Sequence, residues 1–420
     1  MNRMCLFFLI AVSPVLCFSQ QDESLIAKAA EALKPKLVEI RRDLHMYPEL
    51  SNKEVRTSRI VSERLQALGL EVRTGYGVIG ILKGGQPGPV VAVRADMDAL
   101  PIQETRDVPY KSKVDGVMHA CGHDVHTTIA LGTAEVLAGM RDRLKGTVKF
   151  IFQPSEEAWP DGSPSGAARM IREGALDNPQ PSAIYALHVF ERPAGEVSYE
   201  PSGRAGASVD DFVITVKGKA SHAAASPHKG IDAILVAAEC ITALQTLHSR
   251  RMDPRQQMSL AIGTVHGGKA ANILADEVRL AGTLRTLDRG LRDSMKQNMR
   301  TLLAGITSAH GAAFDLEFTI NIPMVLNDRK LIEDSVPSLQ KAAGPANVKQ
   351  DIPSLGSEDF AFYQEVIPGF MFNLGVTNKD KGIVSASHSN TFDVDEDCLV
   401  VGVRAMSNLV MDFQLRGQAP

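Results

Sequence analysis

The order of strands and helices constrains the fold of this chain more than any other feature. Apolar strands alternate with helices up to Val189, and the same alternation resumes after Pro323. This alternation is typical of a layered α/β fold with a mostly parallel sheet. Between Ser208 and Ile322 the order changes to strand, helix, strand, strand, helix, strand. That βαββαβ order is typical of a ferredoxin-like sandwich.

The interruption predicts two domains in a chain of 420 residues, within the two or three that a length of about 150 residues per domain allows. We expect residues 20–207 and 323–420 to form one discontinuous α/β catalytic domain, with a mixed sheet flanked by helices. Residues 208–322 are expected to form a single inserted domain. No internal repeat or low-complexity tract argues for another arrangement.

The first residues have the composition of an export signal. Arg3 precedes an uncharged apolar run over residues 4–17, which is shorter than the roughly 20 residues that a membrane-spanning helix needs. We expect a signal peptide over residues 1–19 and therefore a secreted or periplasmic protein. A first helix of the fold and a lipid-modified Cys17 are the alternatives.

Charge and cysteine content exclude some classes of protein. With 45 basic and 49 acidic residues the formal net charge is −4, which argues against a nucleic-acid binder with a basic face. Removal of the signal would leave Cys121, Cys240 and Cys398. An odd number in an oxidising compartment leaves at least one thiol without an intramolecular partner.

Two elements of the N-terminal half can be placed from local patterns. The apolar spacing from Ser24 to Leu68 is helical, with Ser24 as the expected N-cap, an interruption at Pro35 and an end at Gly69. The run Val90–Val93 predicts a buried parallel strand. It is followed by two carboxylates, Asp96 and Asp98.

The densest group of metal-binding residue types lies between residues 119 and 126. His119, Cys121, His123 and His126 follow one another around Gly122. Thiolate and imidazole are both good ligands of Zn²⁺, so Cys121 and His123 could close on one ion. The alternatives are a cysteine buried as a small apolar residue and histidines that cap the following helix.

A carboxylate pair and two further histidines occupy similar places. Glu156 and Glu157 directly follow the predicted strand 148–152, His188 ends the strand 183–189, and His388 lies in a loop. Site residues collect at the carboxyl ends of core strands. One of two adjacent carboxylates can bind a metal while the other acts as general base. A solvated acidic turn is the alternative.

Longer motifs run through almost the whole chain, from Arg41 to Glu396. They read RRDLHMYPELSNKE, RADMDALP, MHACGHDVHTT, FQPSEEA, ALHV, GKASHAAASP, GTVHGGKAANI, GTLRT, GSEDFAF and SHSNTFDVDE. In this order they closely resemble the M20 metallopeptidase family. The resemblance is to its N-acyl-amino-acid and hippurate-type amidohydrolases, a subgroup that includes the plant auxin-conjugate hydrolases.

The resemblance implies two divalent metal ions per subunit, which could be Zn, Mn or Co. It implies that their ligands are Cys121, His123, Glu157, His188 and His388. Glu156 would be the general acid/base, and Asp98 would orient a ligand. Cys121 fits this subgroup, because many other M20 enzymes have a bridging Asp there. No ligand role is implied for His119 or His126, for which we expect buried or capping roles.

The resemblance also implies that the insert is a lid and dimerisation domain. His222 would reach a substrate carbonyl, often in the site of the partner subunit. Asn272 and Arg285 match positions that contact a substrate carboxylate, and the fork of an arginine suits that contact. A solvated surface charge is the alternative for Arg285. The loop 356–360 is expected to face the site, with no particular role for Glu358 or Asp359.

The implied function is a metal-dependent amidohydrolase that cleaves N-acyl amino acids or small peptides with a free carboxylate. Metal-activated water would lose a proton to Glu156 and attack the amide carbonyl. The metals and His222 would stabilise the oxyanion, and Glu156 would protonate the leaving amine. The alternatives are a dipeptidase or carboxypeptidase of the same family, and a non-catalytic secreted binding protein on this fold.

The expected partners are a small-molecule substrate and a second copy of the chain, bound through the insert. Neither nucleic acid nor a stable membrane contact is expected. Cys240 and Cys398 are expected to be plain core residues.

Overall fold

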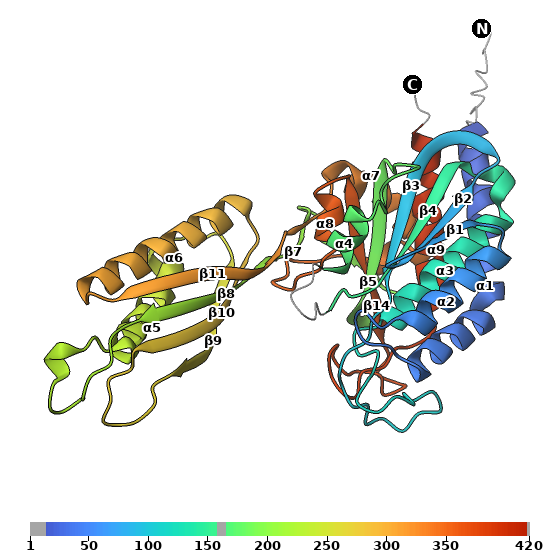
Figure 1. The fold of residues 1–420 in the computed structure, drawn as a ribbon. Helices are drawn as coiled ribbons and strands as arrows, with labels where there is room; N and C mark the ends of the chain where they lie inside the picture. The colour runs from blue at the N-terminus through green and yellow to red at the C-terminus, as the bar shows by residue number, and fades with distance from the viewer. Residues whose placement is uncertain (1–13, 158–164, 418–420) are drawn as a thin grey trace, which may run out of the picture.

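The computed structural model of the chain describes residues 14–157 and 165–417 (Figure 1). Most of the predicted signal peptide, residues 1–13, therefore lies outside the described residues. The first helix, α1 (Pro14–Met46), begins within the predicted signal and continues beyond it.

Two expectations for the first helix were wrong, because α1 contains Ser24 and Pro35 in its interior. Proline removes one helical hydrogen bond, but α1 packs against α3 and α9, and Leu37 and Ile40, which follow Pro35, are buried in the core. The helix ends at Met46 instead, just before Tyr47 and Pro48. A proline disfavours the helical conformation of the residue that precedes it.

The predicted end at Gly69 was correct. Helix α2 (Val55–Ala67) is followed by Gly69 with φ 73°. The N–H of Gly69 donates to the carbonyl of Gln66, and the N–H of Leu70 donates to the carbonyl of Leu65. Such a left-handed glycine closes many helix ends.

The catalytic domain is built on a mixed eight-stranded sheet in which the central strands β4, β3, β5 and β14 are parallel neighbours. The strand order is β1-β2-β4-β3-β5-β14-β6-β13. The bounds are β1 (Glu71–Thr74), β2 (Val78–Lys83), β3 (Gln86–Asp96), β4 (Lys145–Gln153), β5 (Ala183–Pro193), β6 (Val197–Tyr199), β13 (Val348–Gln350) and β14 (Gly369–Thr377).

Both faces of this sheet are covered, as the long apolar strands require. Along β3, Val91 and Val93 belong to the core beneath α1, α2, α3, α7 and α9, whereas Ala92 belongs to the smaller core beneath α4 and α8. The helix bounds are α3 (His123–Gly139), α4 (Gly166–Arg172), α7 (Arg329–Ala343), α8 (Ala361–Gln364) and α9 (Cys398–Arg416). Short 3-10 turns lie at Arg141–Arg143, Pro227–Lys229 and Pro345–Asn347.

Among the described helices, α9 is long and apolar enough to cross a membrane. However, 72% of its apolar window is buried inside the protein. It packs against α1, α3 and α7, and we interpret it as a core helix.

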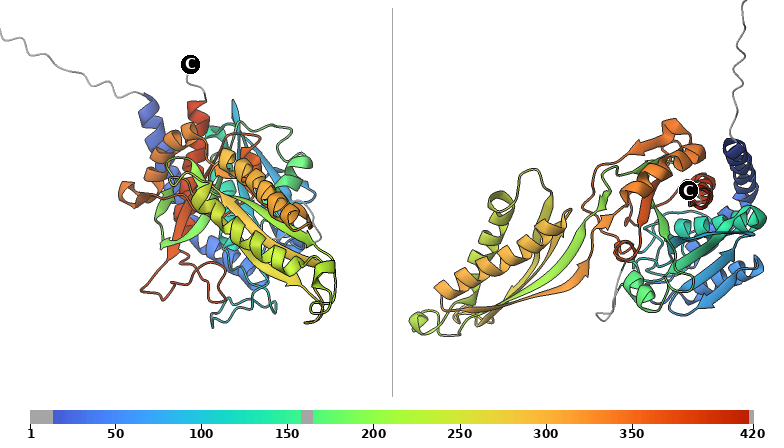
Figure 2. Two further views of the ribbon diagram at one scale, coloured as in Figure 1. Left: turned by 90° about the vertical axis from the view of Figure 1, so that its left-hand side faces the viewer. Right: turned by 90° about the horizontal axis from the view of Figure 1, so that it is seen from above.

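The segment from Ser208 to Ile322 forms a separate four-stranded antiparallel sheet with two helices, in the predicted βαββαβ order (Figures 1 and 2). The strand order is β11-β8-β10-β9. The bounds are β8 (Ser208–Lys217), α5 (Ala233–Arg250), β9 (Met258–Gly267), β10 (Glu277–Thr286), α6 (Arg289–Ala309) and β11 (Ala313–Ile322). The insert has its own hydrophobic core, and Figure 2 shows it as a lobe that projects from the catalytic domain.

The chain enters and leaves the insert at one place. Val209 at the start of β8 pairs with Ile322 at the end of β11. Immediately outside the insert, Gly206 of β7 (Arg204–Gly206) pairs with Val325 of β12 (Val325–Leu326). Two adjacent antiparallel connections therefore join the two lobes.

Candidate metal centre

A large cavity lies where the central strands of the large sheet end, beside the root of the insert. It has a volume of about 1400 Å³. Its lining includes Cys121, Glu156, Glu157, His188 and His388 of the catalytic domain. Residues of the insert also line it, among them Val209, Asp211, Arg285 and Ile320. The cavity thus lies at the carboxyl ends of parallel strands, where ligands bind in α/β proteins.

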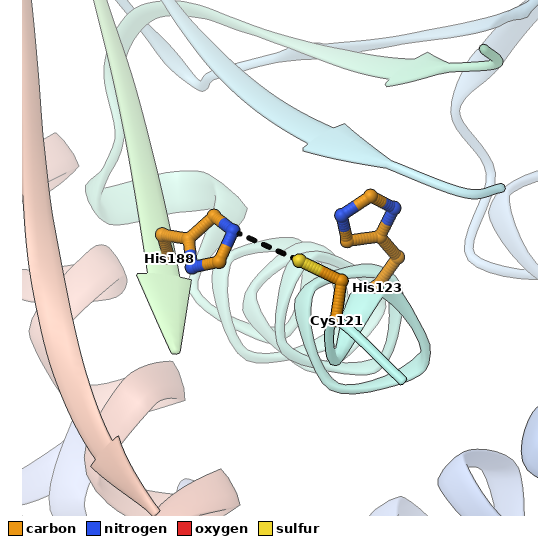
Figure 3. Close-up of side chains that lie close together, drawn as sticks. All are labelled: Cys121, His123 and His188. Carbon is orange, nitrogen blue, oxygen red and sulfur yellow. Dashed lines mark hydrogen bonds between the residues drawn. The ribbon is translucent and has the colours of Figure 1, made fainter. Parts of the chain in front are cut away.

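A glycine sets the position of the first two candidate ligands. Gly122 has φ 91° and is the N-cap of α3, between Cys121 and His123. A Cβ at this position would lie 2.4 Å from Cγ2 of Val189. Only glycine fits such a backbone and such a close approach. The turn brings Cys121 and His123 up to β5, which carries His188 (Figure 3). The predicted end of this strand at Val189 was wrong, because β5 continues to Pro193 and His188 lies midway along it.

Cys121, His123 and His188 form the first group of ligand atoms. One donor atom from each lies within 4.8 Å of the others, and Sγ of Cys121 is 3.4 Å from Nε2 of His188. Nδ1 of His188 donates to the carbonyl of Val189 at 2.6 Å, so Nε2 is the nitrogen left for a ligand role. In Figure 3 the sulfur points between the two imidazole rings.

Cys121, Glu157 and His388 form the second group. Sγ of Cys121 is 3.3 Å from Nε2 of His388, and the same nitrogen is 3.2 Å from Oε1 of Glu157. Because Cys121 belongs to both groups, one thiolate could bridge two ions. The structure therefore brings together all five residues that the family resemblance implies as ligands.

The charges and unpaired atoms of this cluster fit divalent cations. Burial, together with the carboxylates of Glu157 and Glu156, raises the pKa of Cys121 well above its usual range, so a thiolate here needs positive charge beside it. Nε2 of His123 is buried and makes no hydrogen bond to any described residue. Buried polar atoms normally have partners, and a soft donor set of this kind suits Zn²⁺ and similar ions.

Asp98 holds both parts of the site through four hydrogen bonds. Its Oδ1 faces Nδ1 of His123 at 3.2 Å and accepts from the N–H of Glu156 at 3.0 Å. Its Oδ2 accepts from Oγ of Ser51 at 2.6 Å and from the N–H of Glu157 at 3.0 Å. Asp98 therefore fixes the ring of His123 and the backbone of the carboxylate pair together.

Glu156 lies between the ligand cluster and a second acidic group. Its carboxylate lies within 4.8 Å of Glu157 and of His123, and also within 4.8 Å of the carboxylates of Glu358 and Asp359. Burial, and then the charges of Glu358 and Glu157, raise the pKa of Glu156 well above its usual range. A cavity-lining carboxyl group that readily holds a proton suits general acid/base chemistry.

The residues behind Glu156 had no expected role. The guanidinium of Arg94 is fully buried and lies 2.8 Å from Glu358, 2.8 Å from Asp359 and 2.6 Å from Asp96. The signal was an arginine inside an otherwise apolar strand, since buried charges in proteins are paired. Nothing in the sequence indicated which carboxylates would pair with Arg94.

His119 and His126 are both buried, as expected. Nδ1 of His126 is 2.6 Å from Asp96, and its Nε2 accepts from the N–H of Val189 at 2.9 Å. Burial lowers the pKa of His119 to about 4. Neither belongs to the two ligand groups that share Cys121.

The three predicted residues of the insert separate into two sets. Arg285 lines the cavity, and its Nη1 donates to the carbonyl of Leu355 at 2.9 Å. His222 and Asn272 are exposed and lie outside that lining. Nδ1 of His222 accepts from the N–H groups of Ala224 and Ala225. Within this one copy of the chain, the structure does not bring His222 or Asn272 to the ligand cluster.

Comparisons with known proteins agree with this geometry. Residues 92–412 match the sequence pattern of Peptidase family M20/M25/M40. Thermostable carboxypeptidase 2 of Saccharolobus solfataricus is 38% identical over 90% of this chain and 95% of its own length. N-acetylcysteine deacetylase of Bacillus subtilis is 37% identical over 91% of this chain and 98% of its own. A dinuclear metal-binding peptidase of family M20 from Bacillus subtilis superposes with a TM-score of 0.78, at 35% identity over 92% of this chain and 99% of its own.

Proposed function

The chain belongs to peptidase family M20/M25/M40, and on that premise we propose that it is a metal-dependent amidohydrolase. Its substrates are N-acyl amino acids or small peptides with a free carboxylate. The observation that carries the proposal is the position of Cys121, shared by two ligand groups on the wall of one cavity beside Glu156. Deacetylases and amidohydrolases among the relatives support the same chemistry.

The five clustered side chains would hold two divalent ions. Such ions polarise an amide carbonyl and lower the pKa of water. Glu156 supplies the proton transfer, because its carboxylate faces the same cavity and its pKa is raised by burial and by its acidic neighbours. It takes one proton from the attacking water and returns it to the leaving amine, so the carboxylate is regenerated in each cycle.

Arg285 is proposed to bind the substrate carboxylate. It reaches the cavity from β10 of the insert, and one of its nitrogens is held by the carbonyl of Leu355. The remaining N–H donors of the guanidinium suit a carboxylate. This contact would select substrates with a free carboxyl terminus.

A carboxypeptidase or dipeptidase is the second candidate, favoured by the likeness to thermostable carboxypeptidase 2. Both activities need the same ligand cluster and differ only in the group on the acyl side of the bond. The shape of the cavity decides between them. A binding protein without activity is disfavoured, since every expected ligand position carries a metal-binding side chain.

The insert is proposed to join two copies of the chain. His222 and Asn272 are exposed together near the start of α5, where Ile234, Leu235 and Ile273 also expose large apolar side chains. Exposed apolar patches favour protein contacts. In a dimer His222 could complete the site of the partner subunit. Sedimentation analysis tests this, and a monomer with full activity would contradict it.

Export is proposed from the apolar N-terminus alone. N-terminal sequencing of the protein from its native host tests this proposal. A secreted or periplasmic protein that begins near residue 20 is expected. A cytoplasmic protein that retains residues 1–19 would overturn it.

The decisive experiment for the activity uses the mature protein stripped with a chelator and then reloaded with Zn²⁺, Mn²⁺ or Co²⁺. Substrates are acetyl-, benzoyl- and peptidyl-amino acids, each compared with its methyl ester. Metal-restored hydrolysis of the free acids, with the esters turned over poorly, supports the proposal. Hydrolysis that survives complete metal removal contradicts it. The ranking of acyl against peptidyl substrates separates amidohydrolase from carboxypeptidase.

A further inference from the structure

The segment after β4 presents two consecutive carboxylates to the site. Both lie within 4.8 Å of His123, but Glu157 also lies beside Cys121 and His388, whereas Glu156 also lies beside Glu358 and Asp359. The residue that precedes this pair, Ser155, has φ 56°. A left-handed backbone is uncommon for a residue other than glycine and persists where its surroundings enforce it.

Two carboxylates hold the backbone of this turn. The N–H of Ser155 donates to Oε1 of Glu54 at 2.8 Å. The next two N–H groups, of Glu156 and Glu157, donate to the two oxygens of Asp98 at 3.0 Å each. Three successive N–H groups thus donate to two side chains from other parts of the chain.

Glu54 is well placed to cap α2, but its side chain does not do so. It occupies the N-cap position of that helix and makes no side-chain capping bond. The first N–H groups of α2, those of Arg56 and Thr57, donate to Glu49 instead, at 2.9 and 2.8 Å. The carboxyl group of Glu54 therefore does not cap the helix, although it also interacts with the backbone N–H groups of Glu54 itself and of Asn52.

The buried environment of Glu54 disfavours a charged carboxylate. The residue is 4% exposed, and burial together with the charge of Asp98 raises its pKa to about 8. It does not line the cavity. Keeping a carboxyl group in such a place is costly unless it makes a needed hydrogen bond.

Other contacts confine the same turn. Ser155 is fully buried, and its carbonyl accepts from the N–H of Gly166 at 3.0 Å. Tyr76 also contacts Ser155 and donates to Oδ1 of Asn52 at 2.6 Å. Glu54 provides the bond to the one N–H of the turn that Asp98 does not reach.

We propose that Glu54 is a positioning residue for amide hydrolysis, holding the left-handed turn at Ser155 that points Glu156 into the cavity. This inference rests on the proposed function, because Glu54 is taken to position Glu156, the proposed general acid/base. Glu157 lies one residue further from Ser155 than Glu156 does, and its N–H also donates to Asp98, so we expect its place in the ligand cluster to depend less on Glu54.

The expected consequence is a loss of rate without a loss of metal. A displacement of about 1 Å at a reacting group can lower a rate by about 10²-fold. For Glu54→Ala we expect kcat to fall by about 10- to 100-fold, with KM within about threefold of wild type and the full metal content. Glu54→Gln keeps an oxygen that can accept from Ser155, and its kcat should stay within about threefold of wild type.

Glu49→Ala is the matched control. It removes a half-buried carboxylate from the same loop and weakens the start of α2, but it does not touch the turn at Ser155. A lower melting temperature with an unchanged kcat is expected for it. If Glu54→Ala behaves in the same way, Glu54 is only structural and the proposal is wrong.

A second variant and a direct view of the turn complete the test. Glu54→Asp keeps the charge but shortens the side chain, so it should lower kcat as the alanine does, even if Glu54→Ala fails to fold. Crystal structures of Glu54→Ala and Glu54→Asp should show Ser155 leaving the left-handed region, whereas Glu54→Gln should keep it there. An unchanged turn overturns the proposal without reference to any substrate. Wild-type protein without metal-dependent hydrolysis would instead contradict the proposed function.

Discussion

Cys121 and His388 are separated by 267 positions in the chain, yet Sγ of Cys121 lies 3.3 Å from Nε2 of His388. The contact is supported by the backbone, because the N–H of His388 donates to the carbonyl of Ala120 at 2.7 Å. The two loops that supply the second ligand group are thus attached to each other independently of any ion. This prearrangement lowers the conformational cost of forming the site.

Replacement of Cys121, the residue shared by both ligand groups, should prevent both metal ions from binding. Cys121→Ala is expected to lose nearly all bound metal and all measurable hydrolysis, since the thiolate belongs to both ligand groups. Metal content by mass spectrometry after gel filtration checks this. Cys240→Ala, at a buried cysteine on α5 of the insert, is the control and should keep its metal. Full metal content in Cys121→Ala would exclude a bridging thiolate.

Glu156→Gln should separate metal binding from catalysis. We expect bound metal at the wild-type level and a rate of hydrolysis lower by about 10²- to 10⁴-fold, because the amide cannot carry the proton. Glu200→Gln changes another carboxylate on the cavity wall and should turn over substrate like wild type. Near wild-type turnover in Glu156→Gln would remove Glu156 from the mechanism.

Gly122→Ala tests the turn that presents the first ligands. A Cβ would meet Val189 at 2.4 Å on a backbone with φ 91°, so we expect the free energy of unfolding to fall by about 2 kcal/mol or more. Metal affinity should fall as well. Gly139→Ala, at the end of the same helix with open space around it, should change stability by less than about 1 kcal/mol. Urea unfolding of both variants makes the comparison, and equal stabilities would contradict it.

Lys149 should give the stability a dependence on alkaline pH. Its buried Nζ donates to the carbonyls of Ala175 and Asp177 at 3.0 and 2.7 Å, and burial lowers its pKa to about 8. In the unfolded chain a lysine titrates near 10.4, so between these values the unfolded state binds more protons. The contribution of Lys149 to the free energy of unfolding therefore rises with pH in that window, by about 1 kcal/mol per pH unit.

Lys149→Met should remove that rise. The measurement is urea unfolding at several values between pH 7.5 and about 10.4, with Lys229→Met, at an exposed position, as the control. A rise with pH of the same size in Lys149→Met and in wild type would show that another group causes it.

Patterns of period and residue type were enough to predict the insert and the presence of several strands, though not where those strands end. The apolar run Val90–Val93 and the order of elements from Ser208 to Ile322 are local properties of the sequence. The pairing of Cys121 with His388 is not local, and only the resemblance to a family implied it. No pattern within the sequence measures a distance across 267 positions.

The wrong and missed predictions also have their cause in contacts between residues that are far apart in the sequence. Pro35 is a strong local signal against helix, but tertiary packing of α1 on α3 and α9 outweighs it. The buried group of Arg94 with Glu358 and Asp359 was missed because charge in a sequence normally indicates surface. Whether a charged side chain is exposed or paired depends on the folded partners, which lie more than 260 residues from Arg94.

The pairing of Val209 with Ile322, at the point where the chain enters and leaves the insert, has a consequence for the history of the gene. A segment whose two ends are neighbours can be lost, gained or exchanged by recombination while the strands of the host domain stay in register. Joining Gly206 to Val325, which already pair, would need only a short hairpin turn. Chimeras that carry the insert of one relative on the catalytic domain of another are thus a direct route to altered specificity.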